Sequence, residues 1–193
     1  MKKVAIIDYG AGNVQSVKFA MDRLGVSSVV TNDSTILRSA SHVIFPGVGH
    51  ALAAMDQLKK SGIDQLIPEL EQPLLGICLG MQLLCRHSDE GDTRGLGIFQ
   101  SDVKRFQGAV KIPAVGWSQL EIGTHPLFNG LSGASFYFVH SYYATLSDQT
   151  IAESTYGTRF SAALAHNQFM GVQFHPERSG EAGAVLLTNF LNQ

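Results

Sequence analysis

The stretch Pro73-Leu74-Leu75-Gly76-Ile77-Cys78-Leu79-Gly80-Met81-Gln82-Leu83-Leu84 joins an apolar run to a helical pattern through a cysteine. Residues 74–77 predict a short buried strand, and residues 81–85 predict a helix. Glycines stand two residues before and two residues after Cys78, where side chains would crowd a sharp, strained turn. A strand, a sharp turn and a helix form a nucleophile elbow, here with a thiol in place of the more familiar hydroxyl. The stretch therefore predicts that Cys78 is a nucleophile held above the edge of a sheet.

The start of the following helix would serve a nucleophile at Cys78. Unpaired backbone N–H groups and the helix dipole lower the pKa of a nearby thiol and can hold an oxyanion. The alternative is a buried cysteine in a strand–helix unit, because free cysteines are often simple core residues. The glycine setting favours the catalytic interpretation.

Size and composition predict one soluble globular domain spanning residues 1–193. Hydrophobic residues make up 45% and charged residues 16% of the chain. A formal net charge of −2 argues against a nucleic-acid or membrane-surface partner. The N-terminal apolar run is too short for a signal peptide, and no run approaches the roughly 20 residues of a membrane span. Cys78 and Cys85 lie too far apart for a disulfide, so free thiols and a cytoplasmic location are expected.

The pattern around the elbow predicts an α/β fold with an open, mostly parallel twisted sheet flanked by helices. Strands are expected at residues 4–7, 28–31, 42–45, 74–77 and 169–174, with a closing helix at 182–191. Shorter segments after residue 95 predict a small additional mixed or antiparallel sheet. Function is expected at the carboxyl ends of the parallel strands. The turns at residues 8–13 and 46–49, like Cys78, lie at such ends. The first turn resembles half of a dinucleotide fingerprint, but Gln15 stands where the third glycine belongs.

His175 is the best candidate for a general base. It follows the last predicted strand directly and precedes Pro176-Glu177. Proline favours extended geometry in the residue before it, and residues two apart in an extended chain face the same side. The Glu177 carboxylate can then hold the imidazole in one tautomer, giving Cys78 as nucleophile, His175 as base and Glu177 as orienter.

Two alternatives to this triad stay open on the residues alone. A surface His-Pro-Glu turn would explain residues 175–177 without chemistry. A metal site is the other rival, but Cys78, Cys85 and His87 lack paired ligand spacing, so neither a metal nor a cofactor is expected.

With these residues in place, the chain resembles the class I (triad) glutamine amidotransferases, which have a flavodoxin-like sheet. The resemblance is closest to the glutaminase subunits of imidazole glycerol phosphate synthases, and it spans nearly the whole chain. The motifs that carry it are Asp8-Tyr9-Gly10-Ala11-Gly12-Asn13, Phe45-Pro46-Gly47-Val48-Gly49, Gly76-Ile77-Cys78-Leu79-Gly80-Met81-Gln82, Tyr137-Phe138-Val139-His140-Ser141-Tyr142 and Gly171-Val172-Gln173-Phe174-His175-Pro176-Glu177.

The resemblance implies hydrolysis of L-glutamine. Cys78 would attack the side-chain amide to give a thioester and ammonia, and water would then release glutamate. The backbone N–H groups of Leu79 and, after a peptide flip, Val48 would form the oxyanion hole. By motif position, the residues that would bind glutamine are Gly49, Gln82, Glu90, Ser141 and Tyr142.

The resemblance also implies a partner, a (β/α)8-barrel cyclase subunit that receives the ammonia in histidine biosynthesis. Asn13, Trp117, Tyr137 and Arg178 fall at positions that would face it. Two departures lie there: relatives usually carry Lys at the position of Arg178, and commonly Met-Gly-Trp-Asn at residues 115–118, here Val-Gly-Trp-Ser. Both bear on coupling to the partner and not on the triad.

Two other functions remain as alternatives. A paralogous glutaminase subunit would supply ammonia to another synthase, for example in the amidation of surface sugars. A non-enzymatic flavodoxin-like thiol protein would use Cys78 as a redox sensor or binding residue, but it leaves residues 175–177 unexplained.

Overall fold

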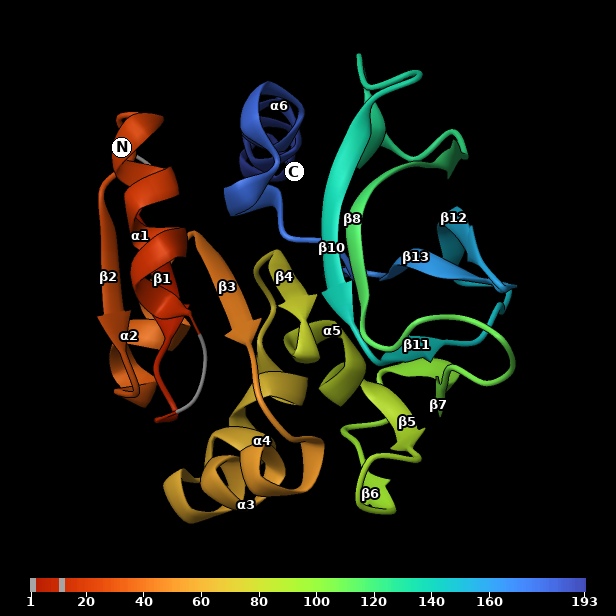
Figure 1. Ribbon diagram of the computed structural model, residues 1–193. Helices are drawn as coiled ribbons and strands as arrows, with labels where there is room; N and C mark the ends of the chain where they lie inside the picture. The colour runs from red at the N-terminus through yellow and green to blue at the C-terminus, as the bar shows by residue number, and fades with distance from the viewer. Residues whose placement is uncertain (1–2, 11–12) are drawn as a thin grey trace.

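The computed structural model describes residues 3–10 and 13–193 (Figure 1). Ala11 and Gly12, in the middle of the turn predicted at residues 8–13, lie outside the described residues.

Five neighbouring strands form the parallel part of the main sheet, in the order β2-β1-β3-β4-β14. They are β1 (Val4–Ile7), β2 (Ser28–Thr31), β3 (His42–Gly47), β4 (Leu74–Cys78) and β14 (Phe169–Val172). All of β1, β3, β4 and β14 is buried, as expected for strands covered on both faces.

Beyond β14 the sheet continues with mostly antiparallel pairs. In the described residues it runs on through β13-β11-β7-β5-β6, with β12 paired to β13 and β9 paired to β12. A separate antiparallel pair is formed by β8 and β10. These strands are β5 (Cys85–Ser88), β6 (Thr93–Arg94), β7 (Phe99–Arg105), β8 (Ala114–Gln119), β9 (Glu121–Ile122), β10 (Ser135–His140), β11 (Tyr142–Ala144), β12 (Thr150–Tyr156) and β13 (Thr158–His166). The predicted fold class is confirmed.

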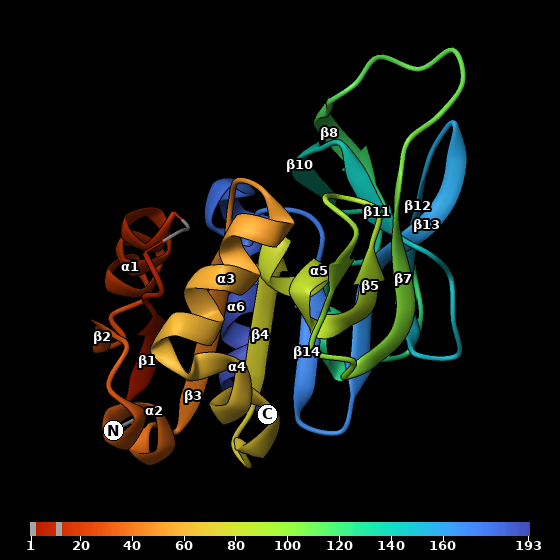
Figure 2. The ribbon, with the colours of Figure 1, turned by 90° about the horizontal axis from the view of Figure 1, so that it is seen from below.

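Helices cover both faces of the parallel strands. They are α1 (Val14–Arg23), α2 (Ser34–Ser39), α3 (Ala51–Ser61), α4 (Ile63–Leu66), α5 (Leu79–Leu84) and α6 (Gly180–Leu191), with 3₁₀ turns η1 (Ile67–Glu69), η2 (Pro126–Phe128) and η3 (Pro176–Arg178). Figure 2 shows α3 and α4 on one side of the strands and α6 on the other. None of the helices within the described ranges is long and apolar enough to cross a bilayer.

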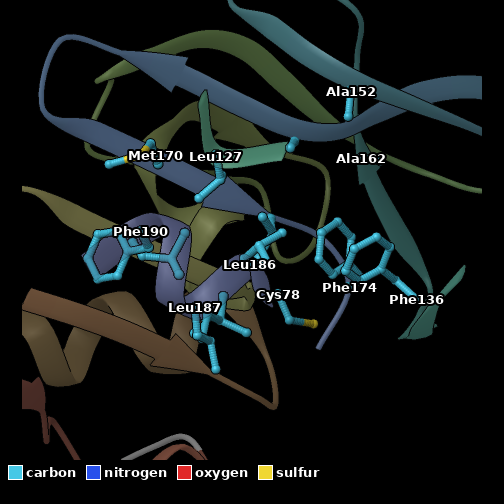
Figure 3. Close-up of a cluster of buried hydrophobic side chains, with 14 of the residues drawn as sticks. Cys78, Leu127, Phe136, Ala152, Ala162, Met170, Phe174, Leu186, Leu187 and Phe190 are labelled. Atoms are coloured by element: carbon cyan, nitrogen blue, oxygen red, sulfur yellow. The ribbon is translucent and has the colours of Figure 1, made fainter. Parts of the chain in front are cut away.

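Two hydrophobic cores follow from the alternation of side chains along the strands. Val4 and Ile6 face the core under α1 and α6, whereas Ala5 and Ile7 face the core under α2, α3 and α4. Figure 3 shows the first core, with residues of α6 packed beside Phe136 and Phe174. Cys78 belongs to the same cluster, so the elbow is attached to a rigid interior.

The parallel register brings the functional turns together. Gly47, the last residue of β3, is paired with Cys78, the last residue of β4, and β14 runs beside β4 on its other side. The turn after β3, the elbow and the segment after β14 therefore emerge at one edge of the sheet.

One prediction near the elbow was wrong. Cys85 was expected to pack within the helix, but α5 ends at Leu84 and Cys85 begins β5. Its backbone is extended and its buried thiol donates to the carbonyl oxygen of Met81 at 3.6 Å. Cys78 and Cys85 are both free thiols.

Candidate active site

The elbow places Cys78 in a strained conformation between β4 and α5. Its φ of 54° and ψ of −111° lie outside the regions that residues with a side chain normally adopt. The flanking glycines allow the chain to pass very close to its neighbours. A Cβ on Gly76 would lie 2.9 Å from the backbone nitrogen of Met81, and one on Gly80 would lie 1.9 Å from the carbonyl oxygen of Phe45.

A cleft of about 330 Å³ opens over Cys78. Nine of the predicted catalytic, oxyanion-hole and glutamine-binding residues line it: Val48, Gly49, Cys78, Leu79, Gln82, Glu90, Ser141, Tyr142 and His175. Asn13 and Arg178, predicted to face a partner, line the same cleft, and Pro113, Val139 and His140 complete it. The cleft therefore joins the elbow to the predicted partner face.

His175 and Glu177 form a buried pair beside the thiol. Nδ1 of His175 lies 2.8 Å from Oε1 of Glu177, and the two residues are 4% and 8% exposed. Glu177 reaches this position from the 3₁₀ turn η3, not from the extended chain that was expected, because the chain bends at Pro176. Nδ1 is engaged by the carboxylate, so Nε2 is the nitrogen left to exchange a proton with Cys78.

The electrostatics of the pair favour a charged imidazole. Burial lowers the pKa of His175, but its interactions with Cys78 and Glu177 outweigh burial and raise the pKa to about 10. His140, the other buried histidine of the cleft, behaves in the opposite way. Burial and, to a smaller extent, the charge of His175 lower its pKa to about 4, although its Nδ1 donates to the carbonyl oxygen of Tyr142 at 2.7 Å. Of these two cleft histidines, His175 is therefore the one set up to carry a second ring proton.

The contribution of the Glu177 carboxylate to the raised pKa of His175 can be tested with the variant Glu177→Gln. Glutamine keeps an acceptor for Nδ1–H but removes the negative charge that stabilises the imidazolium, so the pKa of His175 is expected to fall, by about 1–3 pH units. The measurement is an NMR titration of the His175 ring. The His125 ring, which lies outside the cleft and whose pKa is lowered by burial, is the internal control, and an unchanged His175 titration would contradict the assigned role of Glu177.

Gln82 is held by two hydrogen bonds beneath the cleft. Its Nε2 donates to the carbonyl oxygen of Tyr142 at 2.9 Å and to Oε1 of Gln173 at 2.8 Å. The Nε2 of Gln173 lies in turn 3.6 Å from the Cys78 sulfur. Gln173 was not among the predicted site residues. Its position two residues before His175 was the available signal, because alternate residues of an extended chain face the same side.

Glu90 has a structural contact that the sequence did not reveal. Its Oε2 accepts a hydrogen bond of 2.7 Å from the backbone nitrogen of Ala51, the first residue of α3. The side chain of the N-cap residue His50 makes no capping hydrogen bond, so Glu90 satisfies a backbone N–H at the helix start from outside the helix. This contact fixes the carboxylate at the cleft wall and leaves Oε1 as an acceptor for a cation.

Trp117 and Tyr137 lie outside the cleft. They are paired across β8 and β10, with ring centroids 5.9 Å apart in an edge-to-face arrangement. Trp117 is 60% exposed, and its neighbour Val115 is 58% exposed. No cluster of three or more metal-ligating side chains occurs in residues 3–10 and 13–193.

Comparison with known proteins identifies the family. The class-I glutamine amidotransferase model matches residues 5–193. Imidazole glycerol phosphate synthase subunit HisH of Bacteroides fragilis is 53% identical over 193 residues, covering 98% of each protein. The HisH subunit of Haemophilus influenzae is 44% identical over 196 residues, covering 100% of this chain and 98% of that protein.

Solved structures share the fold. A glutamine amidotransferase aligns with a TM-score of 0.76 at 21% identity, covering 98% of this chain and 97% of the other. PurLQS from Thermotoga maritima aligns with a TM-score of 0.74 at 17% identity, covering 99% and 98%. The chain belongs to the class-I glutamine amidotransferases and, within them, to the HisH subunits of imidazole glycerol phosphate synthase.

Proposed function

We propose that this chain hydrolyses L-glutamine with Cys78, His175 and Glu177 and delivers the ammonia to a (β/α)8-barrel cyclase subunit that makes imidazole glycerol phosphate. The observation that carries the proposal is the buried His175–Glu177 pair beside a strained cysteine in one cleft. We further propose that residues 1–193 form a single glutamine amidotransferase domain. A cytoplasmic location would keep the thiol reduced.

The first half of the reaction forms a thioester. His175 takes the thiol proton, and the sulfur attacks the side-chain carbonyl carbon of glutamine, forming an S–C bond while the C=O electron pair moves onto oxygen. When this intermediate collapses, the C–N bond breaks and the nitrogen leaves as ammonia with the proton from His175. Glu177 stabilises the imidazolium between these two transfers, consistent with the raised pKa of His175.

The second half releases glutamate. Water attacks the thioester carbon and gives a proton to His175, the S–C bond breaks, and the sulfur leaves as thiolate. The oxyanion of both steps would be held by the backbone N–H groups of Leu79 and, after rotation of its peptide, Val48. Losing one such donor typically costs about 10²–10³ in rate, enough for the rotation to switch the enzyme on or off.

The cleft wall suggests how glutamine is oriented. Glu90, fixed by the first turn of α3, presents a carboxylate to the α-ammonium group. The N–H groups of Gln82 donate to Tyr142 and Gln173, so its Oε1 remains to accept a hydrogen bond from the substrate. Ser141, Tyr142 and Gly49 line the remaining walls.

The test is a glutaminase assay with and without the partner. The isolated chain is expected to release glutamate very slowly, because an oxyanion hole that lacks the Val48 donor is incomplete. Adding the cyclase subunit from the same source, with its nucleotide substrate, should raise the rate by about 10²-fold or more. No glutamate from the assembled complex would overturn the proposal. Strong turnover by the isolated chain would contradict the switch but not the chemistry.

Trp117 is the best candidate for an anchor at the partner face, because it is large, exposed and buttressed by Tyr137. Trp117→Ala is expected to weaken cyclase binding by about 30-fold or more, the effect of losing a hot-spot residue. Calorimetric titration with the cyclase measures this. Leu146→Ala is the matched control, since Leu146 is 42% exposed and does not line the cleft. Equal affinities of the two variants would remove Trp117 from the interface.

A further inference from the structure

We infer that Gln173 is a fourth working member of the site, an amide donor that holds the Cys78 sulfur in place and supports its negative charge. This inference rests on the proposed function for its role in turnover. Nε2 of Gln173 lies 3.6 Å from the sulfur, within hydrogen-bond range for a sulfur acceptor. Gln173 is completely buried, so water does not compete for this contact.

The orientation of the Gln173 amide follows from its partners. The carbonyl oxygen of Tyr142 can only accept, so the group of Gln82 that faces it must be the NH₂. The same NH₂ faces Gln173 at 2.8 Å and therefore requires an oxygen there. With Oε1 of Gln173 turned toward Gln82, its NH₂ must point at Cys78. The two amides thus donate in one direction, from Gln82 to Gln173 and from Gln173 to the sulfur, while the other N–H of Gln82 donates to the carbonyl oxygen of Tyr142.

The backbone around Gln173 leaves this side chain little freedom. Its own N–H donates to the carbonyl oxygen of Ala162 at 2.8 Å. The next residue, Phe174, packs in the core with its ring centroid 4.2 Å from that of Phe136 (Figure 3). Gln173 and His175 thus lie on either side of an anchored core residue, and both interact with the same sulfur.

A donor at this place acts when the sulfur is charged. The sulfur is a thiolate before it attacks glutamine and again when it leaves the thioester, whereas in the thioester it is neutral. Removing the donor should therefore make the thiolate harder to form. A thiolate that is less stabilised is, however, intrinsically more nucleophilic. This combination distinguishes a donor from a residue that only fills space.

The other groups that influence the thiol are unchanged when Gln173 is replaced. The titratable and charged side chains near the sulfur or lining its cleft are Tyr9, Glu90, His140, Tyr142, His175 and Arg178, with Glu177 behind His175. A change in the pH response of Cys78 can then be assigned to the lost amide.

The experiment compares Gln173→Met with the unsubstituted chain, both in complex with the cyclase. Methionine has similar length and no donor. The rate of iodoacetamide alkylation at Cys78 is followed against pH by mass spectrometry, which separates it from buried Cys85. The alkylation midpoint is expected to rise by about one pH unit, as for the loss of a hydrogen bond to a charged group, while the plateau rate at high pH does not fall. The glutaminase kcat should fall about tenfold, with KM changing less.

Gln168→Met is the matched control. Gln168 stands just before β14, and its Nε2 donates to the carbonyl oxygen of Leu70 at 2.6 Å, so the substitution removes an amide from the same segment without touching the sulfur. Its midpoint and kcat should stay at the unsubstituted values. If Gln173→Met also leaves the alkylation midpoint and kcat at the unsubstituted values, the inference is wrong.

A second measurement does not depend on the variant folding. In the unsubstituted chain labelled with ¹⁵N at glutamine side chains, the Gln173 NH₂ resonance should shift when Cys78 is alkylated, and the Gln168 resonance should not. A Gln173 resonance that does not shift on alkylation would overturn the inference.

Failure of the proposed function and failure of this inference give different results. If the complex releases no glutamate but Gln173→Met still changes the alkylation of Cys78, the proposed reaction fails and the contact with sulfur stands. If glutamate is released and Gln173→Met changes nothing, only the inference fails.

Discussion

Cys78→Ala is expected to lower glutamate release by the assembled synthase by about 10⁴-fold or more, because removing the nucleophile of a catalytic triad removes the covalent route itself. Binding of glutamine should survive, since the other residues of the cleft remain. The measurement is glutamate formed per complex at saturating glutamine. Cyclisation supplied with external ammonium should proceed as in the unsubstituted complex, which shows that the partner is intact.

Cys85→Ala is the control for this prediction. Cys85 is also a free, buried thiol, seven residues along the chain. Burial strongly raises the pKa of its thiol, the nearby Asp102 adds to the rise, and no glycine turn presents it to the cleft. It should keep nearly full activity. Loss of activity in Cys85→Ala, or its retention in Cys78→Ala, would contradict the assignment of the nucleophile.

Local pattern was sufficient to predict the parallel part of the fold. Residues 4–7 and 28–31 are strands with those bounds, and the predicted strand at residues 74–77 lies within β4. The strand structure of these segments follows from their apolar runs and from the glycine turns beside them. The last predicted strand, 169–174, stops at Val172. Beyond that residue β4 has given way to the elbow, so β14 has no parallel neighbour with which to continue.

Contacts between distant segments could not be predicted in the same way. Nothing in the sequence near Glu90 indicates that its carboxylate would reach the first turn of α3. Nor does any local pattern show that Gln82 and Gln173, 91 residues apart, share a hydrogen bond. The second contact depends on β14 being inserted beside β4, which is a tertiary pairing. The bend at Pro176 likewise replaced an extended chain by a 3₁₀ turn, while still leaving Glu177 on His175.

The elbow depends on the close approach of the α5 backbone at Gly80 to the β3 backbone at Phe45. The variant Gly80→Ala tests this dependence. The added Cβ would lie 1.9 Å from the carbonyl oxygen of Phe45 and 3.0 Å from its carbon. Phe45 is a buried residue in the middle of the sheet, so β3 cannot move away without disturbing its pairing with β4. We expect a loss of about 3 kcal/mol in the free energy of unfolding, the upper range for overpacking, and a Tm lower by about 6–12 °C.

Activity should fall further than stability alone explains, because α5 carries Leu79 and Gln82, which line the cleft beside Cys78. A displacement of about 1 Å at the nucleophile can cost about 10² in rate. Gly108→Ala is the control: Gly108 has a positive φ of 87°, unlike Gly80, but a Cβ there meets nothing within 4 Å. That variant carries only the cost of a left-handed backbone, about 1–2 kcal/mol, and should remain fully active. If Gly80→Ala were as stable and as active as Gly108→Ala, the spacing of β3 and α5 would not be what holds Cys78 in its strained turn.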